Sequence, residues 1–504
     1  MSKYLLGIDN GSTVVKAAIF STTGDEVAVA SKRTRLLTPE HGHSERDMNE
    51  IWTETAEAIR EVLELSNINP DDIACICCTG HGNGLYLIDK NRNPVRNAIM
   101  SMDNRAKAYS DRWIKDGLDA KVRPKTMQSI WPAQPNALLA WLKDNEPESI
   151  GNTEWILMCK DYIRFRLTGE INAELTDFSG TSLINNQTKA YDQQLLEMFG
   201  LGDLMKKFPP IIQTHDIVGN ITREASELTG LSEETPVAGG MFDIDACGLA
   251  SGMINDSQLC MIAGTWGNNQ YISKQPVVDE NVFMTSCYSI PGYYLMLEGS
   301  ATSASNLEWF LTEFFDEKIY GFKEQGQSVY DYCNGLVSSV SPEESNIVFF
   351  PFLYSSNIHP EAKACFLGID GWHNKGHILR SIYEGIVFGH KTHVEKLLQF
   401  REMPETIQLT GGATNSSEWV KIFADTFQVP IELPSGTELG ALGAAIAAAV
   451  AVQIYPNYES AVKAMVNFSR VIEPDKERTD LYEKKYNRYK KSAESLVGLW
   501  SDFN

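Results

Sequence analysis

Five consecutive residues near the N-terminus combine groups that suit phosphate and a metal ion: Asp9, Asn10, Gly11, Ser12 and Thr13. They end the strand-like segment YLLGID, and a carboxylate at a strand end can hold Mg²⁺ directly or through water. Gly11 lets the backbone approach a ligand closely, and the two hydroxyls can face phosphate oxygens. Lys16 follows three residues later. A plain turn rich in Asn and Gly would explain the same residues about equally well.

Two further glycine turns offer backbone N–H groups to a ligand. Gly264-Thr265 lies in a second strand–turn–strand segment, LCMIAGTWGNNQYIS, and is a candidate second phosphate cradle. Gly411-Gly412 follows the strand TIQLT and leads through Asn415 toward a helix, so that an adenine or ribose could lie flat on the backbone. A tight turn and an ordinary helix-capping loop are the structural alternatives.

Asp243 is the candidate general base. It stands in GGMFDID, after a strand and before a segment of small residues. A carboxylate in that place can accept the proton of an attacking hydroxyl, which phosphoryl transfer requires. Asp245 competes for the role, and a simple helix N-cap is the alternative for either residue. No GxxxxGK[ST] sequence is present, so the chain has no P-loop motif.

The elements that must position these residues indicate an α/β protein. The segment after Pro236 repeats the strand–glycine turn–strand order of residues 4–20, and strands alternate with helices afterwards. Such an echo across some 250 residues predicts a duplicated architecture with a cleft between halves, divided as residues 1–246 and 247–504. Helices are expected at about 47–66, after the capping spacing Asp47 and Glu50, and at 479–499.

The amino-acid composition indicates which partners the protein is expected to have and in which compartment it is expected to lie. The 504 residues include 44 Lys and Arg against 66 Asp and Glu, a formal net charge of −22. That balance argues against nucleic acid and an anionic membrane as partners. Of the nine cysteines, Cys75, Cys77 and Cys78 lie in an apolar run that is typical of a buried strand, and the others form no CxxC pair. This pattern favours the reducing cytoplasm, and the N-terminus lacks the apolar stretch of a signal peptide. The run Leu439–Tyr455, mostly Ala and Gly, is predicted to be a buried helix.

Taken together, these residues resemble the FGGY carbohydrate kinases. The resemblance spans nearly the whole chain and includes the two phosphate motifs, the adenosine motif with Ala424-Asp425 downstream, and a long C-terminal signature from Ala364 to Glu384. It implies two ribonuclease-H-like domains of the actin/hexokinase ATPase type around an interdomain cleft. It also implies ATP and Mg²⁺ as cofactors, with sugar bound by the first domain and nucleotide by the second.

The resemblance assigns roles to individual residues. Asp243, followed nine residues later by Gly252 as in the family, matches the catalytic base, and Asp9 matches the metal-associated aspartate. Mg²⁺ is then expected near Asp9 and Asp243. Sugar contacts are expected in the loop after IACICC, where this chain has His81, Gly82 and Asn83 in place of the common Gln-Met-His.

Several departures from the D-xylulokinase pattern point to the L-xylulose kinase branch. Asp103 keeps its carboxylate within SMDNR, where W-x-D-x-R is common, and could bridge two sugar hydroxyls. Segments such as GHSERDM and EGSATSASNLEWF also fit this branch. L-xylulose is therefore the favoured substrate, and erythritol, D-xylulose, glycerol and gluconate remain alternatives. A non-enzymatic actin-like ATPase or sugar sensor is the rival class, and a homodimer is left open.

Overall fold

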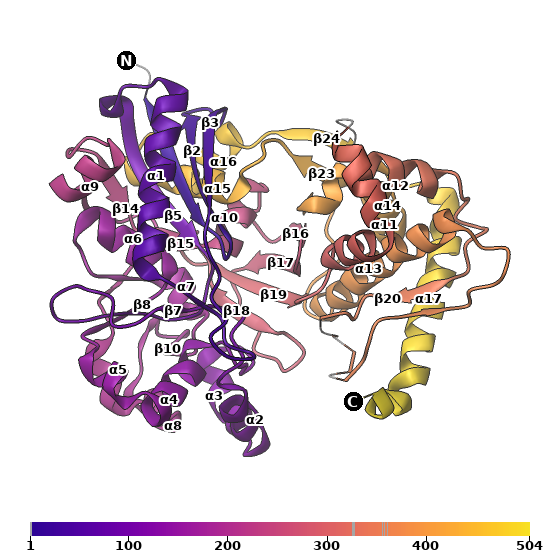
Figure 1. Ribbon diagram of the computed structural model, residues 1–504, viewed down its shortest axis with the longest axis horizontal. Coiled ribbons are helices and arrows are strands. Elements are labelled where there is room, and N and C mark those ends of the chain that lie inside the picture. The colour runs from indigo at the N-terminus through magenta and orange to yellow at the C-terminus, as the bar shows by residue number, and fades with distance from the viewer. Residues whose placement is uncertain (1–2, 325–327, 355, 357, 360, 504) are drawn as a thin grey trace. The chain divides into compact units, whose positions relative to one another are not determined.

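The computed structural model describes residues 3–324, 328–354, 356, 358–359 and 361–503 (Figure 1). The chain forms two compact units. Unit 1 comprises residues 1–254, 272–296 and 436–467, and unit 2 comprises residues 255–271, 297–435 and 468–504. The boundary expected at 246/247 falls inside helix α10 (Asp243–Ala250), in unit 1. Two later segments of the chain also return to unit 1, so contacts between distant segments define the units.

Unit 1 is built on a twisted mixed sheet. Its strand order is β13 (Ile217–Asn220), β14 (Pro236–Ala238), β5 (Ile73–Gly80), β1 (Tyr4–Asn10), β2 (Val14–Ser21) and β3 (Glu26–Arg33), with β15 (Met241–Phe242) beside β5. β1 and β2 form an antiparallel hairpin, whereas β5 runs parallel to β1. Both β1 and β15 therefore bring their carboxyl ends to the end of β5, as the positions of Asp9 and Asp243 require.

The helices of unit 1 are α1 (Met48–Ser66), α2 (Lys107–Lys115), α3 (Leu118–Thr126), α4 (Pro135–Asn145), α5 (Pro147–Asn152), α6 (Cys159–Thr168), α7 (Leu175–Ser179), α8 (Gln193–Met198), α9 (Arg223–Thr229), α10, α15 (Leu439–Ala451) and α16 (Tyr458–Met465). Of these, α1, α6, α10 and α15 contact strands of this sheet. Leu6 and Ile8 share a buried cluster with Ile51 of α1. Gly7 points the other way, because successive residues of a strand face opposite sides of the sheet. A Cβ atom at Gly7 would meet the carbonyl of Ala441 in α15.

Short strand pairs complete unit 1: β4 (Glu45–Arg46) with β7 (Ala98–Ile99), β6 (Tyr86–Ile88) with β8 (Trp155–Leu157), β9 (Ala173–Glu174) with β12 (Ile211–Ile212), and β10 (Ile184–Asn185) with β11 (Ala190–Tyr191). The strand β18 (Met284–Cys287) belongs to the returning segment 272–296. The pairs β4–β7 and β6–β8 flank the loops around residues 44, 81 and 103.

Unit 2 has a sheet in which β16 (Gln258–Ala263) pairs antiparallel with β17 (Gly267–Ser273) and parallel with β22 (Thr406–Thr410). β23 (Ile431–Pro434) and β24 (Phe468–Ile472) extend it. The remaining elements include β19 (Tyr294–Ser300), β20 (Val348–Phe350), β21 (Cys365–Leu367), α11 (Ser305–Glu324), α12 (Val329–Ser338), α13 (Lys375–Leu397), α14 (Ser417–Phe427) and α17 (Thr479–Leu496).

The duplication predicted from the sequence is present in the topology. The antiparallel hairpin β1–β2 with its parallel neighbour β5 has the same arrangement as β16–β17 with β22. Each hairpin turn carries one of the two predicted phosphate motifs. The α/β class is thereby confirmed, and the two glycine turns occupy equivalent places in their units.

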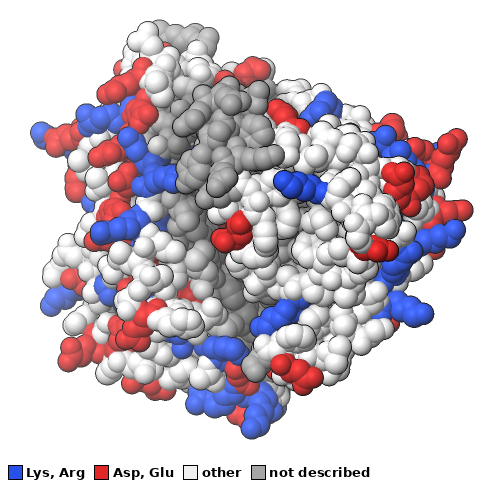
Figure 2. Space-filling view, turned by 45° about the vertical axis from the view of Figure 1, so that its right-hand side comes forward, with Lys and Arg blue, Asp and Glu red and all other residues white. Residues whose placement is uncertain are grey.

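The predicted helices at 47–66 and 479–499 are also confirmed. Asp47 caps α1 by accepting the N–H groups of Asn49 and Glu50, while the Glu50 side chain accepts the N–H of Arg35. α17 buries Tyr482, Tyr486, Tyr489 and Ala493 on one face. In the described part of the chain, no helix has the length and apolar character needed to span a membrane. Acidic and basic side chains are interspersed on the face seen in Figure 2.

Candidate active site

Asp9 lies at the end of β1, opposite Lys16 of β2 in the strand register. The Lys16 ammonium contacts Glu438 at 2.6 Å, just before α15 begins. Gly440 follows, and a Cβ atom there would come within 2.4 Å of the Asp9 Oδ2 atom. Burial raises the pKa of Asp9 to about 6, against the opposing charge of Lys16. The glycine therefore allows α15 to begin directly against a half-buried carboxylate.

Asp243 is the first residue of α10, and Phe242 occupies the N-cap position. Its position depends on β15, which pairs with the end of β5, and on the Thr79 hydroxyl, which donates to the Met241 carbonyl at 3.0 Å. Burial, reinforced by the negative charges of Asp9 and Asp177, raises the pKa of Asp243 well above its ordinary value. Asp243 thus lies close to Asp9 in space, although 234 residues separate them.

Asp245 differs from Asp243 in its surroundings. Its side chain is fully buried, and its Oδ1 atom accepts hydrogen bonds from the Ser289 backbone N–H at 2.9 Å and hydroxyl at 3.1 Å. Asp243 is only half-buried. Access therefore favours Asp243 over Asp245 as the group that reaches a substrate.

The first phosphate motif forms the β1–β2 turn. Gly11 donates its N–H to the Val14 carbonyl, Ser12 is half-buried and Thr13 is exposed. Asn10 is fully buried, and its carbonyl accepts the backbone N–H of His81 at 3.0 Å. The predicted phosphate turn and the predicted sugar loop are therefore adjacent, joined by a backbone hydrogen bond.

His81 is buried and uncharged. Burial lowers its pKa to about 3. Its Nδ1 atom lies 3.3 Å from the Gly82 carbonyl, which can only accept, so that nitrogen carries the proton. The Nε2 atom then accepts from the Tyr86 hydroxyl at 2.9 Å. This pairing fixes the tautomer and the orientation of the ring.

Asn83 is the residue of this loop whose polar atoms best suit a ligand. Its φ of 60° is left-handed, and its N–H donates to Asp177 Oδ1 at 3.3 Å. The side-chain Oδ1 atom is buried and has no hydrogen-bond partner among the described residues. A buried carbonyl without a partner costs free energy, so a ligand hydroxyl at this atom would be stabilising.

Asp103 is engaged within the protein. Its carboxylate accepts the Ser44 N–H at 2.6 Å and three hydrogen bonds from Arg105, at 2.8, 2.9 and 2.9 Å. Arg105 also donates to Glu45 at 2.8 Å. These bonds use the four acceptor positions of a carboxylate, and they balance the charge of Arg105.

The donor set suits Mg²⁺ through two carboxylates. After burial, the negative charge of Asp9 is the next cause of the raised pKa of Asp243, and a divalent cation would relieve that repulsion. Within the described residues no group of three His, Cys, Asp or Glu side chains could hold a metal. Mg²⁺ commonly binds one or two carboxylates, with water and substrate phosphates completing its shell, so this pair fits.

The second phosphate motif is the β16–β17 turn of unit 2. Gly264 donates to the Trp266 carbonyl at 3.2 Å, and Thr265 is exposed. Two bonds anchor the turn: Ala304 donates to the Gly264 carbonyl at 2.9 Å, and the Ser305 hydroxyl to that of Thr265 at 3.0 Å.

The adenosine motif packs directly on this turn. Gly411 has a φ of 91°, and a Cβ atom there would come within 2.8 Å of the backbone of Ala263 and Gly264. Gly412 and Asn415 bound the short 3₁₀ helix η3 (Gly412–Asn415), and both are exposed. Helix α14 is capped by Ser416 and not by Thr414 or Asn415. Unit 2 therefore brings its two glycine motifs together.

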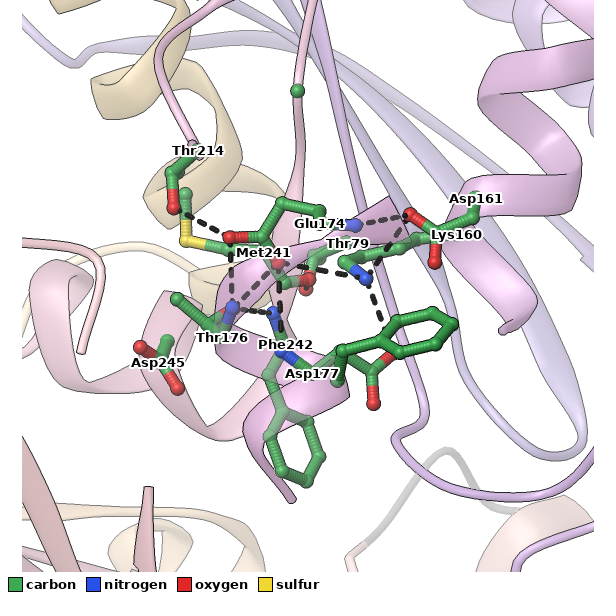
Figure 3. Close-up of polar contacts among 12 residues, drawn as sticks. Thr79, Lys160, Asp161, Glu174, Thr176, Asp177, Thr214, Met241, Phe242 and Asp245 are labelled. Atoms are coloured by element: carbon green, nitrogen blue, oxygen red, sulfur yellow. Dashed lines mark hydrogen bonds and ion pairs between the residues drawn. The ribbon is translucent and has the colours of Figure 1, made fainter. Parts of the chain in front are cut away.

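The sequence motifs did not single out a buried charged cluster beside Asp243. Lys160 contacts Asp161, Glu174 and Asp177 at 3.3, 3.5 and 3.2 Å (Figure 3), and all four side chains are fully buried. Charged residues between apolar neighbours, in MCKDYI and AELTDF, are the available signal in the sequence. That signal gives no indication that the two segments meet.

Comparison with known proteins identifies the family of the chain. Residues 4–249 match the N-terminal domain, and residues 259–452 the C-terminal domain, of the FGGY family of carbohydrate kinases. A "Probable L-xylulose kinase" of Pasteurella multocida is 35% identical over 500 residues, which cover 98% of this chain and 99% of the relative. The "L-xylulose/3-keto-L-gulonate kinase" of Escherichia coli is 34% identical, over 99% and 98%.

Solved structures support the fold. A ligand-bound xylulose kinase from Lactobacillus acidophilus superimposes with a TM-score of 0.90 at 24% identity, over the full length of both chains. The family models account for both halves of the sequence and the relatives for nearly all of it. The chain therefore belongs to the FGGY family of carbohydrate kinases and is a kinase that phosphorylates a sugar hydroxyl.

Proposed function

We propose that this kinase transfers the γ-phosphate of ATP to a hydroxyl of a small ketose or polyol, with L-xylulose as the favoured substrate and Asp243 as the general base. The position of Asp243 carries the proposal. This carboxylate is half-buried at the start of α10 and has a raised pKa, whereas the nearby Asp245 is fully buried and bonded to Ser289. A raised pKa makes a carboxylate a stronger proton acceptor.

The reaction is an in-line phosphoryl transfer. The substrate hydroxyl gives its proton to the Asp243 carboxylate as its oxygen forms a bond to the γ-phosphorus. The bond from that phosphorus to the bridging oxygen breaks, and ADP leaves with the electron pair. Positioning and charge stabilisation supply most of the catalysis in such transfers. When bound, Mg²⁺ near Asp9 and Asp243 would supply positive charge for the phosphate oxygens.

Nucleotide contacts are proposed for both units. Ser12, Thr13 and Lys16 in unit 1, and Gly264 and Thr265 in unit 2, are assigned to phosphate oxygens. Gly411, Gly412 and Asn415 are assigned to adenosine. Support comes from the exposure of Thr13, Thr265 and the two glycines, because a ligand can reach only backbone and hydroxyl groups that the protein leaves open.

An uncharged substrate suits the sugar loop. The free Asn83 Oδ1 atom accepts a hydroxyl, and the neutral His81 adds no charge. Arg105 is balanced by Asp103 and Glu45 and offers little to a carboxylate such as that of gluconate. The charge of buried Arg46 does reach this loop, because it helps to lower the pKa of His81. Asp103, whose acceptor positions are filled, is assigned to holding Arg105 and Ser44. The two relatives described above are both named for L-xylulose, which favours this sugar, and the Escherichia coli relative is also named for the carboxylate 3-keto-L-gulonate.

A coupled ADP-release assay tests the substrate. The panel comprises L-xylulose, D-xylulose, erythritol, glycerol, pentitols and gluconate, each with ATP and Mg²⁺. We expect the highest kcat/KM with L-xylulose. A tenfold preference for any other member would reject L-xylulose while leaving the kinase assignment intact, and ADP release without added sugar serves as the background.

A further inference from the structure

A buried ionic cluster beside the proposed base has no role in the proposed reaction steps. Lys160 lies on α6 among three carboxylates, and Arg164 donates to one of them, Asp161, at 2.8 Å. Two cations thus face three acidic groups, all without solvent exposure. Taking so many charges out of water is costly, and a buried ion pair is weak evidence for stability. Stability alone therefore does not account for this cluster, and we ask which residues it holds in place.

One arm of the cluster ends next to Asp243. Glu174 Oε2 contacts the Lys160 ammonium at 3.5 Å and accepts the Thr176 hydroxyl at 2.7 Å. The Thr176 oxygen in turn accepts the backbone N–H of Phe242 at 2.9 Å (Figure 3). A hydroxyl has one proton, which goes to the carboxylate, so its lone pair must face the Phe242 N–H. The direction of every bond in this arm is fixed.

The other arm ends in the sugar loop. Asp177 Oδ2 contacts the Lys160 ammonium at 3.2 Å, and Asp177 Oδ1 accepts the Asn83 N–H at 3.3 Å. Asn83 adopts a left-handed backbone conformation and presents the unpaired side-chain oxygen described above. An external hydrogen bond to its N–H helps to hold a residue in that conformation.

We propose that Lys160, with Glu174, Thr176 and Asp177, is a positioning network. It fixes the position of the backbone before Asp243 relative to the backbone of Asn83. These residues act through Asp243 and Asn83, and they do not touch the substrate. The proposal rests on the function proposed above, because it assigns the two positioned residues to proton transfer and sugar binding. A displacement of about 1 Å in such groups can cost about 100-fold in rate.

The test compares two substitutions at one position. Thr176→Val keeps the shape of the side chain but removes the hydroxyl, whereas Thr176→Ser keeps the hydroxyl and removes a methyl group. We expect Thr176→Val to lower kcat by at least about tenfold, with the sugar KM within about threefold of wild type, and Thr176→Ser to remain near wild type. Equal loss in both variants, or no loss in either, would overturn the network.

Asp177→Asn reports the second arm. The amide contacts the Lys160 ammonium more weakly than the carboxylate does, so we expect the sugar KM to rise by at least about fivefold and by more than kcat falls. An unchanged sugar KM would remove Asp177 from the network.

Amide hydrogen exchange separates this proposal from the proposed function. The Phe242 amide should exchange faster in Thr176→Val than in wild type and remain protected in Thr176→Ser, whether or not any sugar is phosphorylated. If no sugar in the panel is a substrate, the proposed function fails, and exchange at Phe242 still decides the network. Unchanged exchange in Thr176→Val overturns it even if kcat falls.

Discussion

The Phe242 ring fills the space that a side chain at Gly82 would need: a Cβ atom there would lie 2.0 Å from the ring carbon Cε2. Gly82 belongs to the proposed sugar loop, and Phe242 immediately precedes the proposed base. The sugar loop and the start of α10 are therefore in direct contact, and a glycine makes that contact possible.

Gly82→Ala should disturb both partners. The added methyl group must displace the Phe242 ring or the loop, and we expect kcat/KM for the sugar to fall by about 10- to 100-fold. Steady-state kinetics with varied sugar measure the effect. Gly151→Ala is the matched control, because Gly151 is exposed on α5 with open space around it. Equal kinetics in Gly82→Ala and wild type would contradict the proposed role of the contact.

Asp243→Asn should remove the general base. We expect kcat to fall by roughly 100- to 10,000-fold, with ATP binding retained, because only the proton acceptor changes. ADP release and calorimetric titration with ATP check the two parts. Asp116→Asn, which removes a charge from an exposed position of unit 1, should behave as wild type. Normal turnover by Asp243→Asn would reject the assignment.

Asp9→Asn should stabilise the protein above pH 6. The pKa of Asp9 is about 6 in the folded protein and 3.8 ordinarily, so the folded state holds the proton more tightly. Wild type therefore loses stability as the pH rises from about 4 to about 6 and keeps that deficit at higher pH. Asn cannot ionise, so the variant avoids a cost on the order of 3 kcal/mol.

Thermal unfolding midpoints of both proteins, measured from pH 4 to 8 without Mg²⁺ or nucleotide, test this expectation. The two curves should converge near pH 4 and separate above pH 6, with the variant higher. A difference that does not change with pH would show that ionisation of Asp9 is not its source.

Lys160→Met should destabilise unit 1 strongly. The substitution leaves Asp161, Glu174 and Asp177 buried with fewer cations, and breaking such a buried cluster costs about 3–5 kcal/mol. Denaturant unfolding measures the loss. Lys107→Met removes an exposed lysine paired with Asp111 at 2.7 Å and should cost less than about 1 kcal/mol. Similar losses in the two variants would be inconsistent with the buried cluster.

Gly411→Ala and Gly412→Ala distinguish a structural role of these glycines from a role in ATP binding. Gly411→Ala places a side chain on a backbone with a positive φ, and its methyl group would meet the Ala263 backbone. Both the free energy of unfolding and the affinity for ATP should therefore fall. At Gly412 the space is open, and stability should hold while the KM for ATP rises by at least about threefold if adenosine lies there. An unchanged KM in Gly412→Ala would remove that residue from the nucleotide site.

Much of the architecture could be predicted from the sequence because its signals are local. Each of these signals lies within a short stretch of sequence. They are the glycine turns after apolar strands, the Asp47 cap of α1, and the helical spacing of the tyrosines in α17. The repeat of strand–turn–strand segments also predicted the duplicated β1–β2–β5 and β16–β17–β22 topology, because the same pattern of side chains favours the same hairpin.

Other features depend on contacts between distant segments. Asp9 approaches Asp243 because β1 and β15 both flank β5. The start of α15 lies against Asp9, more than 400 residues away in sequence, because Gly440 has no side chain at that contact. From the sequence, Asp103 was predicted to offer its carboxylate to sugar hydroxyls. In the folded chain this carboxylate accepts hydrogen bonds from Ser44 and Arg105. The charged residues between apolar neighbours around Lys160 did not indicate that this segment meets Glu174 and Asp177.

The sequence by itself therefore determined the family, the fold and the identity of the chemical groups, since each motif is a short stretch whose residue types suit phosphate, metal or a hydroxyl. Only the tertiary structure decided which carboxylate is accessible, which is saturated and which is paired with a buried lysine. The physical reason is that burial, charge pairing and hydrogen-bond saturation arise from neighbours brought together by the sheet and not from neighbours along the chain.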